Sequence, residues 1–409
     1  MDDNVGNKIL IREFNEDRDT EVVMKLEKNC EIGSKEGISI FTNIMDNPLC
    51  RIRLYPVHVM LVAELLENGE LVGMVQGCIK YVGTGFGGRH VKLGCILGLR
   101  VSPRHRRIGI GLKLVHSMEE WMMRNDAEYT FLATEEKNVA STNLFTHKCS
   151  YEKFSSLIIY FQPVSLPAKR PSLQDIKIEK LPIDQAISFY KDRLRSKDIY
   201  PVDIDAILKE KLSLGTWVSY FKEDDDWIGL NLHNKDQNDE DVTDSSKTPS
   251  SWAIVSIWNT SEAYRLQIRR CYPFKFFHTT LNYARDIIFP CLKLKLPAVM
   301  SDSLSLEEVP FGFLFLYGIQ GEGERVGELM KSLWSFASSL AENVDCKAIM
   351  TELGVTDPLR EHVPQGSTSS MSCINDLWYF KRVNGPSYDE DDLTTKRPVG
   401  NVFVDPRDF

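Results

Sequence analysis

The sequence predicts an α/β fold with a mixed sheet, of the α+β kind, arranged as two tandem lobes. Apolar runs typical of strands alternate with amphipathic helical patterns along the chain. One such run ends at Val101, and a basic glycine loop connects it to an amphipathic helix. A second strand, glycine-rich turn, helix and strand follow in the same order at 311–351. Together these observations predict two related α/β units in one chain.

Composition limits the class of protein. The chain has 409 residues, of which 43% are hydrophobic and 26% charged, as in ordinary globular proteins with two or three domains. The net charge of −9 argues against a general nucleic-acid binder, so we expect no direct DNA binding. The nine cysteines are scattered without a Cys-x-x-Cys pair, which predicts reduced thiols and no metal site. Because there is no signal-peptide pattern and no membrane-length apolar run, we expect no membrane association and a location in cytoplasm or nucleus.

The first predicted lobe covers residues 1–165. Its two central strands, Val57–Leu66 and Glu70–Tyr81, are joined at Asn68-Gly69, and Asn-Gly between apolar runs is typical of a hairpin. The other predicted elements are a strand at 8–14, helices at 17–28 and 37–45, a glycine-rich loop at 83–88, a strand at 92–101, a helix from Gly111 to Asn125, a strand at 129–133, a helix at 138–145 and a strand at 151–164.

A proline-containing linker at 166–174 is predicted to separate the second lobe, residues 175–384. Strands are expected at 175–181, 215–221 and 251–259. Between the last two, residues 223–244 contain nine acidic side chains, which predicts a disordered loop over much of that stretch. The tail 385–409 is polar until Val402-Phe403-Val404, which we expect to dock on the body.

The second lobe is predicted to repeat the first. An apolar strand at 311–317 precedes a glycine-rich turn at 320–327, a helix, and a strand at 347–351. From Gly111 to Thr134 is 23 positions, and from Gly327 to Thr351 is 24. A shared strand–helix–strand theme without duplication would also explain this spacing. If the repeat is real, Arg325 stands where the first copy has Gly109, and Glu322 and Glu324 replace arginine charge, so this second site should be degenerate.

The glycine loop of the first copy suits an anion. Backbone N–H groups at the start of a helix lack partners, and the helix dipole is positive there. Gly109 and Gly111 leave these groups accessible, while Arg104, Arg106 and Arg107 add positive charge at the same end. The loop therefore predicts a site for a pyrophosphate.

These features resemble the GNAT superfamily of acetyl-CoA-dependent N-acetyltransferases. The resemblance is carried by the Arg106-x-x-Gly109-x-Gly111 loop with its strand and helix, and by the Asn138…Leu144-Phe145 helix. A closer similarity, over nearly the whole chain, is to the plant Hookless-type N-acetyltransferases. It is carried by the segments Cys50–Arg53, Met60–Glu64, Leu97–Pro103, Leu212–Thr216 and Phe403–Phe409.

The GNAT resemblance implies that acetyl-CoA is the co-substrate and that its pyrophosphate binds the loop amides. The cofactor-binding residues implied are Leu99, Arg100, Val101, Arg106, Arg107, Ile108, Gly109, Ile110, Gly111 and Asn138. The alternatives are a plain capped helix with solvated arginines, a core position for Val101, and a helix N-cap for Asn138, which explains that asparagine as well as a pantetheine contact does.

The catalytic residues are less well marked. Many GNAT enzymes have a tyrosine acid where this chain has Phe145, and the strand that holds a glutamate base in some relatives reads Gly94-Cys95-Ile96. Glu135 is our candidate catalytic base, with Glu136 beside it, although such a pair is commonly a solvated surface feature. Tyr129 and Tyr151 could donate a proton or simply pack, and Phe86 could belong to a lid or to a flexible hairpin tip.

We therefore expect an N-acetyltransferase that moves acetyl from acetyl-CoA to an amine, by direct attack in a ternary complex. The acceptor is open, and a protein lysine is one candidate. A non-catalytic regulator or scaffold that still binds acetyl-CoA is the alternative, favoured by Phe145 and the missing carboxylate near Cys95. The Hookless-type similarity further implies a role in ethylene- and auxin-linked differential growth and a nuclear location. Whether the chain forms a homo-oligomer is open.

Overall fold

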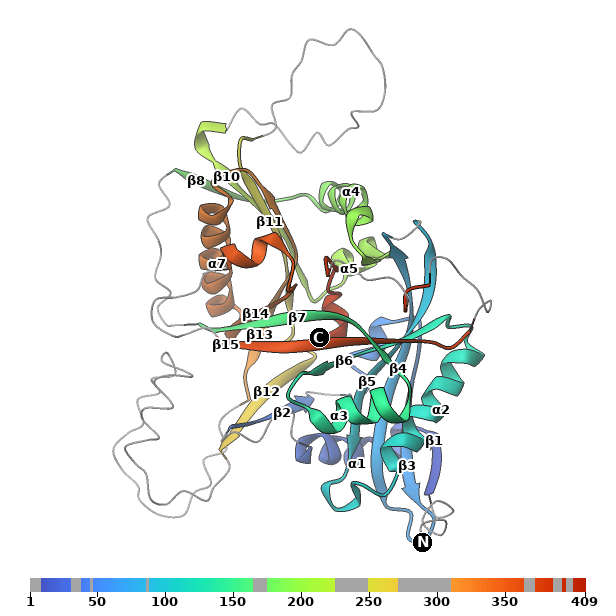
Figure 1. Cartoon of the computed structure of the whole chain (residues 1–409). Coiled ribbons are helices and arrows are strands. Elements are labelled where there is room, and N and C mark those ends of the chain that lie inside the picture. The colour runs from blue at the N-terminus through green and yellow to red at the C-terminus, as the bar shows by residue number, and fades with distance from the viewer. Residues whose placement is uncertain are drawn as a thin grey trace, which may run out of the picture.

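The computed structural model describes residues 9–30, 38–44, 47–85, 88–164, 175–224, 249–270, 310–363, 372–384, 392–394 and 400–409. One mixed sheet of 13 strands runs through these segments (Figure 1). In spatial order its strands are β1 (Ile9–Glu13), β3 (Val57–Leu65), β4 (Leu71–Thr84), β5 (His90–Val101), β6 (Tyr129–Glu135), β15 (Ser372–Arg382), β7 (Glu152–Pro163), β14 (Cys346–Gly354), β13 (Gly312–Glu322), β11 (Trp252–Asn259), β10 (Ser213–Phe221) and β8 (Ile176–Lys180), with β9 (Ile199–Pro201) paired to β4.

Helices cover both faces of this sheet. In the first half, α2 (Ile110–Arg124) packs on one face and α1 (Glu16–Asn29) on the other, each through its own cluster of buried side chains. In the second half, α7 (Val326–Asn343) covers one face, while α4 (Ile183–Arg193) and α5 (Ile204–Lys209) pack against the other. None of these described helices combines the length and apolar character needed to cross a bilayer.

Most predicted elements are confirmed. The hairpin turns at Gly69, whose φ of 71° is the left-handed conformation that glycine adopts readily. Helix α2 ends with Asn125 as its C-cap, as its sequence pattern predicts. The side chains of Val402, Phe403 and Val404 are buried, so this short apolar run docks on the body. Phe86, the linker 166–174 and nearly all of the acidic loop 223–244 lie outside the described residues.

Two predicted elements are wrong. The helix expected at 37–45 is a strand, β2 (Ile38–Ile44), which pairs antiparallel with β12 (Tyr264–Arg270). A partner more than two hundred positions away supplies its hydrogen bonds, and local pattern cannot show such a partner. The glycine-rich turn expected at 320–327 is shorter, because Gln320, Gly321 and Glu322 extend β13 and pair with β11. Only residues 323–325 separate this strand from α7.

The two predicted lobes share the sheet by exchanging their last strands. Strand β15, from the end of the second copy, lies between β6 and β7 of the first copy. Strand β7, from the end of the first copy, lies between β15 and β14. The boundary predicted near residue 165 therefore falls in a region where both copies contribute to one continuous sheet, and the lobe limits stay a prediction.

The internal repeat extends to backbone detail. Strands β5 and β13 each carry a β-bulge against their antiparallel partner, at Gly98 and at Gly318. Both glycines adopt a left-handed conformation, with φ of 53° and 61°. Each bulged strand then pairs parallel with the strand that follows its helix, β5 with β6 and β13 with β14. These parallel pairs carry the candidate site and its counterpart.

Candidate functional site

The two strands at the predicted site diverge from one another. Strands β5 and β6 pair only through Leu93–Cys95 and Tyr129–Phe131. Beyond these residues, β4 is the only described strand that pairs with β5, and β15 is the only one that pairs with β6. The facing edges at 96–101 and 132–135 thus enclose a gap, the first wedge, whose backbone polar groups have no described partner strand on that side. An extended ligand that carries amides could pair with these edges.

The basic glycine loop opens onto the end of this wedge. Arg107 and Gly109 both have positive φ, 68° and 87°. A Cβ added at Gly109 would meet no atom within 4 Å, so the loop is open to solvent at this point. Helix α2 begins at Ile110 without a side-chain cap. Its first N–H groups are therefore available to an anion, as the sequence predicts.

The arginines of the loop have different positions. The Arg106 Nε–H donates to the carbonyl oxygen of Val101 at 3.1 Å, which ties the loop to the end of β5. Arg104 and Arg107 are exposed. Arg100 is engaged elsewhere, because its Nε–H donates at 3.0 Å to the buried Glu27 of α1. Its backbone lies at the wedge, but its side chain holds α1 against β5.

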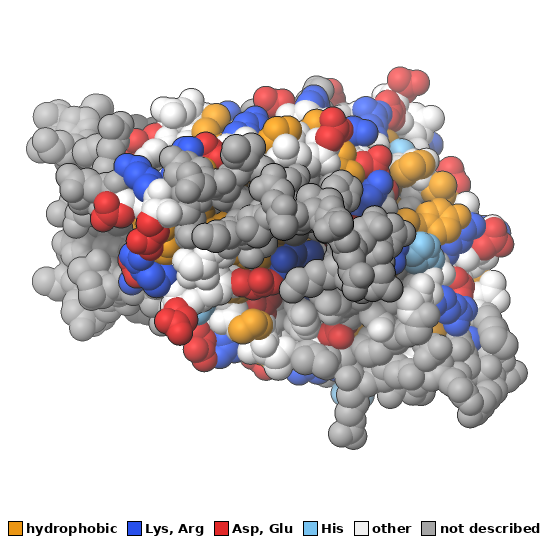
Figure 2. Space-filling view, turned by 90° about the horizontal axis from the view of Figure 1, so that it is seen from above, with side chains coloured by type: hydrophobic (Ala, Val, Ile, Leu, Met, Phe, Trp, Pro, Cys, Tyr) orange, Lys and Arg blue, Asp and Glu red, His pale blue; other side chains and the backbone are white. Residues whose placement is uncertain are grey.

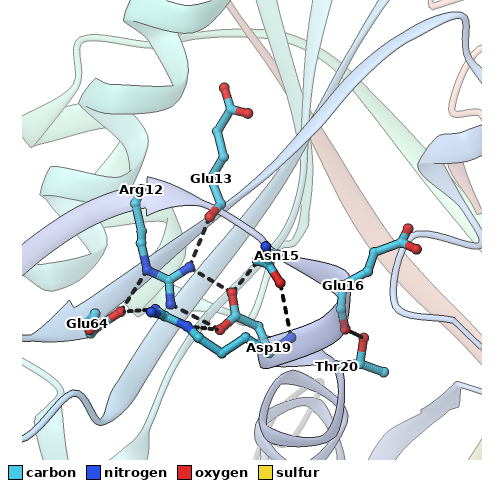
Figure 3. Close-up of polar contacts among 8 residues, drawn as sticks. Arg12, Glu13, Asn15, Glu16, Asp19, Thr20 and Glu64 are labelled. Atoms are coloured by element: carbon cyan, nitrogen blue, oxygen red, sulfur yellow. Dashed lines mark hydrogen bonds and ion pairs between the residues drawn. The ribbon is translucent and has the colours of Figure 1, made fainter.

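A charged network fixes the other end of α1 (Figure 3). Arg12 of β1 lies between Asp19 of α1 and Glu64 of β3, with nitrogen–oxygen distances of 2.7 Å to each. Asn15 caps the helix by accepting from the Arg18 N–H, and its own N–H donates to Asp19. Helix α1 is thus anchored at its start to β1 and β3 and at its end to β5.

Asn138 and Phe145 belong to the helical segment that follows β6. The Asn138 side chain accepts from the Ser141 N–H at 3.1 Å, so it is the N-cap of α3 (Val139–Asn143). The cap explanation of this residue is confirmed, and its contact with pantetheine stays a prediction. Phe145 is buried in the π-helical turn η4 (Leu144–Lys148). Its ring packs edge-on against the ring of Tyr151, with 5.4 Å between the ring centroids. Tyr151 and Tyr129 are both buried in the core.

Glu135, the candidate base, ends β6 beside two further carboxyl groups. It lies opposite Asp376 of β15, and Glu352 of β14 lies near Asp376 across β7. Burial raises the pKa of Glu135. Burial also raises the pKa of Asp376 to about 6, and it raises that of Glu352 well above its ordinary value. Of these three, only Glu135 has appreciable solvent exposure.

The neighbouring Glu136 behaves as the surface alternative predicts. It is exposed and accepts from the Asn375 Nδ2–H at 2.8 Å. Glu352, by contrast, accepts from the Trp378 Nε1–H at 3.3 Å inside the core. Glu135 and Glu352 follow Thr134 and Thr351 in the two copies, but Glu135 ends its strand and is partly exposed, whereas Glu352 lies inside β14 and is buried.

Sequence reasoning missed a buried ionic cluster formed by the C-terminal segment. Asp408 accepts from Lys80 of β4 and from the Tyr55 hydroxyl, and Arg407 pairs with Asp405 and Asp203, each at 2.7 Å. Burial alone would raise the pKa of Asp405, but Arg407 and Lys80 hold it below its ordinary value. The signal was the charged run 405–408 directly after a docking apolar run.

This cluster borders the closed end of the wedge. A cavity of about 10 Å³, room for a single water, is lined by Lys80, Leu93, Phe131, Trp378 and Asp405 among others. Leu93 and Phe131 belong to the last paired stretch of β5 and β6. Among the described residues, no group of three His, Cys, Asp or Glu side chains could hold a metal ion.

Comparison with known proteins identifies this arrangement. The family model described as the acetyltransferase (GNAT) family matches residues 35–151. A protein of Arabidopsis thaliana named "Probable N-acetyltransferase HLS1" is 37% identical, over 98% of this chain and 100% of that protein. The chain belongs to the GNAT family, in its plant HLS1-like branch. A second relative, "Acetyl transferase GW6a" of Oryza sativa subsp. japonica, is 29% identical over 98% of this chain and 97% of that protein.

Solved structures show how far the fold extends in this HLS1-like chain. A crystal structure of Saccharomyces cerevisiae N-myristoyltransferase with bound myristoyl-CoA aligns with a TM-score of 0.54 and 11% identity, covering 97% of this chain and 85% of that chain. At this identity the likeness concerns the fold alone. Because it spans the whole chain, it agrees with two tandem GNAT lobes. Membership of the GNAT family implies an acyl-CoA co-substrate, and the individual contacts assigned to it stay predictions.

Proposed function

We propose that this HLS1-like protein transfers an acetyl group from acetyl-CoA to an amine. One observation carries the proposal: the gap between the diverging strands β5 and β6 opens onto an uncapped helix N-terminus flanked by arginines. The amide-bearing pantetheine arm would pair with the edges of β5 and β6. The pyrophosphate would bind the N–H groups near 107–111, with Arg104 and Arg107 close by.

The chemistry uses few groups of the chain. The acceptor amine must lose a proton before its nitrogen attacks the thioester carbonyl, and Glu135 would accept that proton because its raised pKa makes it a better base. The new amide forms as the carbon–sulfur bond breaks. Phe145 has no hydroxyl, so the departing thiolate would take its proton from water. The amine attacks directly, while both substrates are bound.

A titration with acetyl-CoA, coupled to a CoA-release assay over an amine panel, tests the proposal. The panel should contain lysine peptides, polyamines and small amines. We expect saturable acetyl-CoA binding and CoA release that depends on an amine. Absence of acetyl-CoA binding by the folded protein would refute the proposal.

One alternative has structural support. Phe145 is fully enclosed and Cys95 stands where some relatives keep a carboxylate, so the site is short of acid and base groups. These features favour a regulator or scaffold that binds acetyl-CoA without turnover. Binding without CoA release, over the whole panel, would select this alternative.

The cellular role is proposed on the relatives alone. A nuclear location and a part in hormone-linked differential growth would fit the HLS1-like branch. The test is a fluorescent fusion together with the hook and growth phenotype of a plant that lacks the gene. Uniform exclusion of the fusion from nuclei would contradict the nuclear part.

A further inference from the structure

The second lobe contains a wedge of its own. Strands β13 and β14 pair in parallel from Gly312 with Cys346 to Leu316 with Thr351, and then separate. From Tyr317 to Glu322, β13 is paired with β11 on one side, and no described strand pairs with it on the other. The bulge at Gly318 repeats the one at Gly98. We call this gap the second wedge.

A cleft of about 370 Å³ lies at the mouth of the second wedge, within the size range of ligand pockets. Part of its wall is Ile319, Gln320, Gly321 and Glu322, the stretch of β13 with a free edge. The Nε2 of Gln320 is buried without a hydrogen-bond partner. At the bulge that precedes this stretch, the Tyr190 hydroxyl donates to the Gly318 carbonyl at 3.0 Å. The free strand edge therefore lines an accessible cleft.

The second wedge lacks the anion-binding end of the first. The turn 323–325 is too short to form a loop like 102–109. The Arg325 N–H, at the N-cap of α7, already donates to the Ser251 Oγ at 3.2 Å. Glu322 precedes this turn and Glu324 lies within it, while the Arg325 side chain is already paired with Glu223 and with Glu328 in the first turn of α7. A phosphate-bearing ligand would be repelled at this position.

The cleft is framed by ion pairs with an excess of carboxylates. Arg193 pairs with Glu322 and also lies over the Trp252 ring, 4.8 Å from its centroid. Lys197 lies 3.8 Å from Asp357. Asp192 adds a further carboxylate to the lining, and Glu324 follows at the turn. The unpaired edge of β13 can form backbone hydrogen bonds with a ligand, and the carboxylates at the cleft favour a cationic one.

We propose that the second wedge binds an extended basic peptide, which adds a short strand to the free edge of β13. Residues 319–322 offer about 13 Å of edge, enough for about four peptide residues at 3.3 Å each. Lysine or arginine side chains of the peptide meet Glu322, Glu324 and Asp192, while its amides pair with the backbone. If the proposed function holds, this segment belongs to a protein acceptor, but the binding itself does not depend on catalysis.

The test is fluorescence anisotropy with the full chain and a labelled octapeptide of alternating lysine and valine. Two matched probes separate charge from backbone pairing. One replaces each lysine by glutamate, and the other keeps the lysines but carries N-methyl groups on alternate amides. We expect saturable binding of the first probe and at least about tenfold weaker binding of the other two.

The matching variant is Glu322→Lys with Glu324→Lys, compared with Glu21→Lys with Glu120→Lys. Both pairs change net charge equally, and Glu21 and Glu120 are exposed on α1 and α2 of the first lobe. Only the first pair should weaken binding, by about tenfold. Acetyl-CoA should not compete with the peptide. Equal weakening by both pairs, indifference to N-methylation, competition by acetyl-CoA, or no binding would each overturn the proposal. Acetyl-CoA calorimetry on the same samples tests the proposed function separately.

Discussion

The two wedges of this protein have the same backbone plan and opposite chemistry. Each is formed where a glycine-bulged strand parts from a parallel neighbour. Both end at a helix that begins without a side-chain cap, but the first lies beside exposed arginines. The second ends at a short turn whose Arg325 N–H is occupied, and Arg325 itself is paired with Glu223 and Glu328. A duplicated backbone can thus keep its strand geometry, which core packing requires, while its loop loses or gains a ligand.

On the face shown in Figure 2, the basic and acidic side chains of the described residues are interspersed. On this face the charge that a ligand meets is set by local groups.

The sharpest way to break the comparison is to place negative charge at the first helix. Gly111→Glu should lower acetyl-CoA affinity by at least about 100-fold, because a carboxylate would stand where the pyrophosphate binds. Gly111→Ala is the control, since an added Cβ would meet its nearest neighbour, the Leu144 side chain, at an ordinary 3.6 Å. In the second lobe, Arg325→Glu should leave the affinity unchanged. Calorimetry measures all three, and equal affinity for Gly111→Glu would refute the assignment of the loop.

A second comparison concerns the corresponding glutamates. Glu135→Gln should lower turnover by about 100-fold with little change in stability, because Glu135 is the proposed proton acceptor and is only half-buried. Glu352→Gln should leave acetyl-CoA affinity unchanged, because Glu352 is enclosed in the core. The measurements are steady-state rates and thermal unfolding. Full activity of Glu135→Gln would remove it from the mechanism, and Glu136→Gln is its control.

Asp376, between those glutamates, should make stability depend on pH. Its pKa is raised from 3.8 to about 6, so the folded state binds more protons than the unfolded chain between these values. The stability that depends on the protonation of Asp376 is therefore fully present below about pH 4. It is lost, by about 2–3 kcal/mol in the free energy of unfolding, as the pH rises through 6. Asp376→Asn should be more stable than the wild type by about that amount at pH 8, and similar to it at pH 4. Denaturant unfolding of both proteins at pH 4 and pH 8 tests this. If the difference in unfolding free energy between Asp376→Asn and the wild type is the same at both pH values, the pKa of Asp376 is not raised.

The two bulge glycines should differ in the cost of substitution. Gly98→Ala should cost about 1 kcal/mol, from its left-handed backbone, since the nearest side-chain atom would lie 3.6 Å from the new Cβ. Gly318→Ala should cost about 2–3 kcal/mol, because the Tyr190 hydroxyl would lie only 2.5 Å from that Cβ and must give up its hydrogen bonds. Equal losses in chemical denaturation would show that the second wedge can relax around Tyr190.

The smallest expected effect concerns the missing acid. Phe145→Tyr should raise turnover by about tenfold. This is below the roughly 10²–10⁴-fold typical of general acids, because the hydroxyl enters a packed site beside Tyr151. Acetyl-CoA affinity should stay nearly constant. A fast wild-type enzyme with a neutral Phe145→Tyr would show that water alone suffices at the thiolate. If both proteins bind acetyl-CoA but release no CoA, the regulatory alternative becomes the better account.

Local sequence was sufficient for most elements of the first lobe, apart from the segment at 38–44, and for the loop. Asn68-Gly69 determined a hairpin, and the glycines between a strand and an amphipathic run determined an open helix start at Ile110. The alignment of the two copies also placed Arg325 at the position of Gly109, and the two residues are the N-caps of α7 and α2. These features depend on residues that are neighbours in the chain, so the sequence alone can predict them.

Tertiary structure decided what depends on distant partners. The segment at 38–44 became a strand because β12 pairs with it, and β15 entered the sheet of the first lobe because β6 and β7 both left an edge to be paired. The Arg100 side chain turned to Glu27, and the charges of Asp405, Arg407 and Asp408 became a buried cluster with Lys80 and Asp203. A sequence pattern records which residues can be buried or paired, but only the folded chain determines which distant group compensates each hydrogen bond and charge.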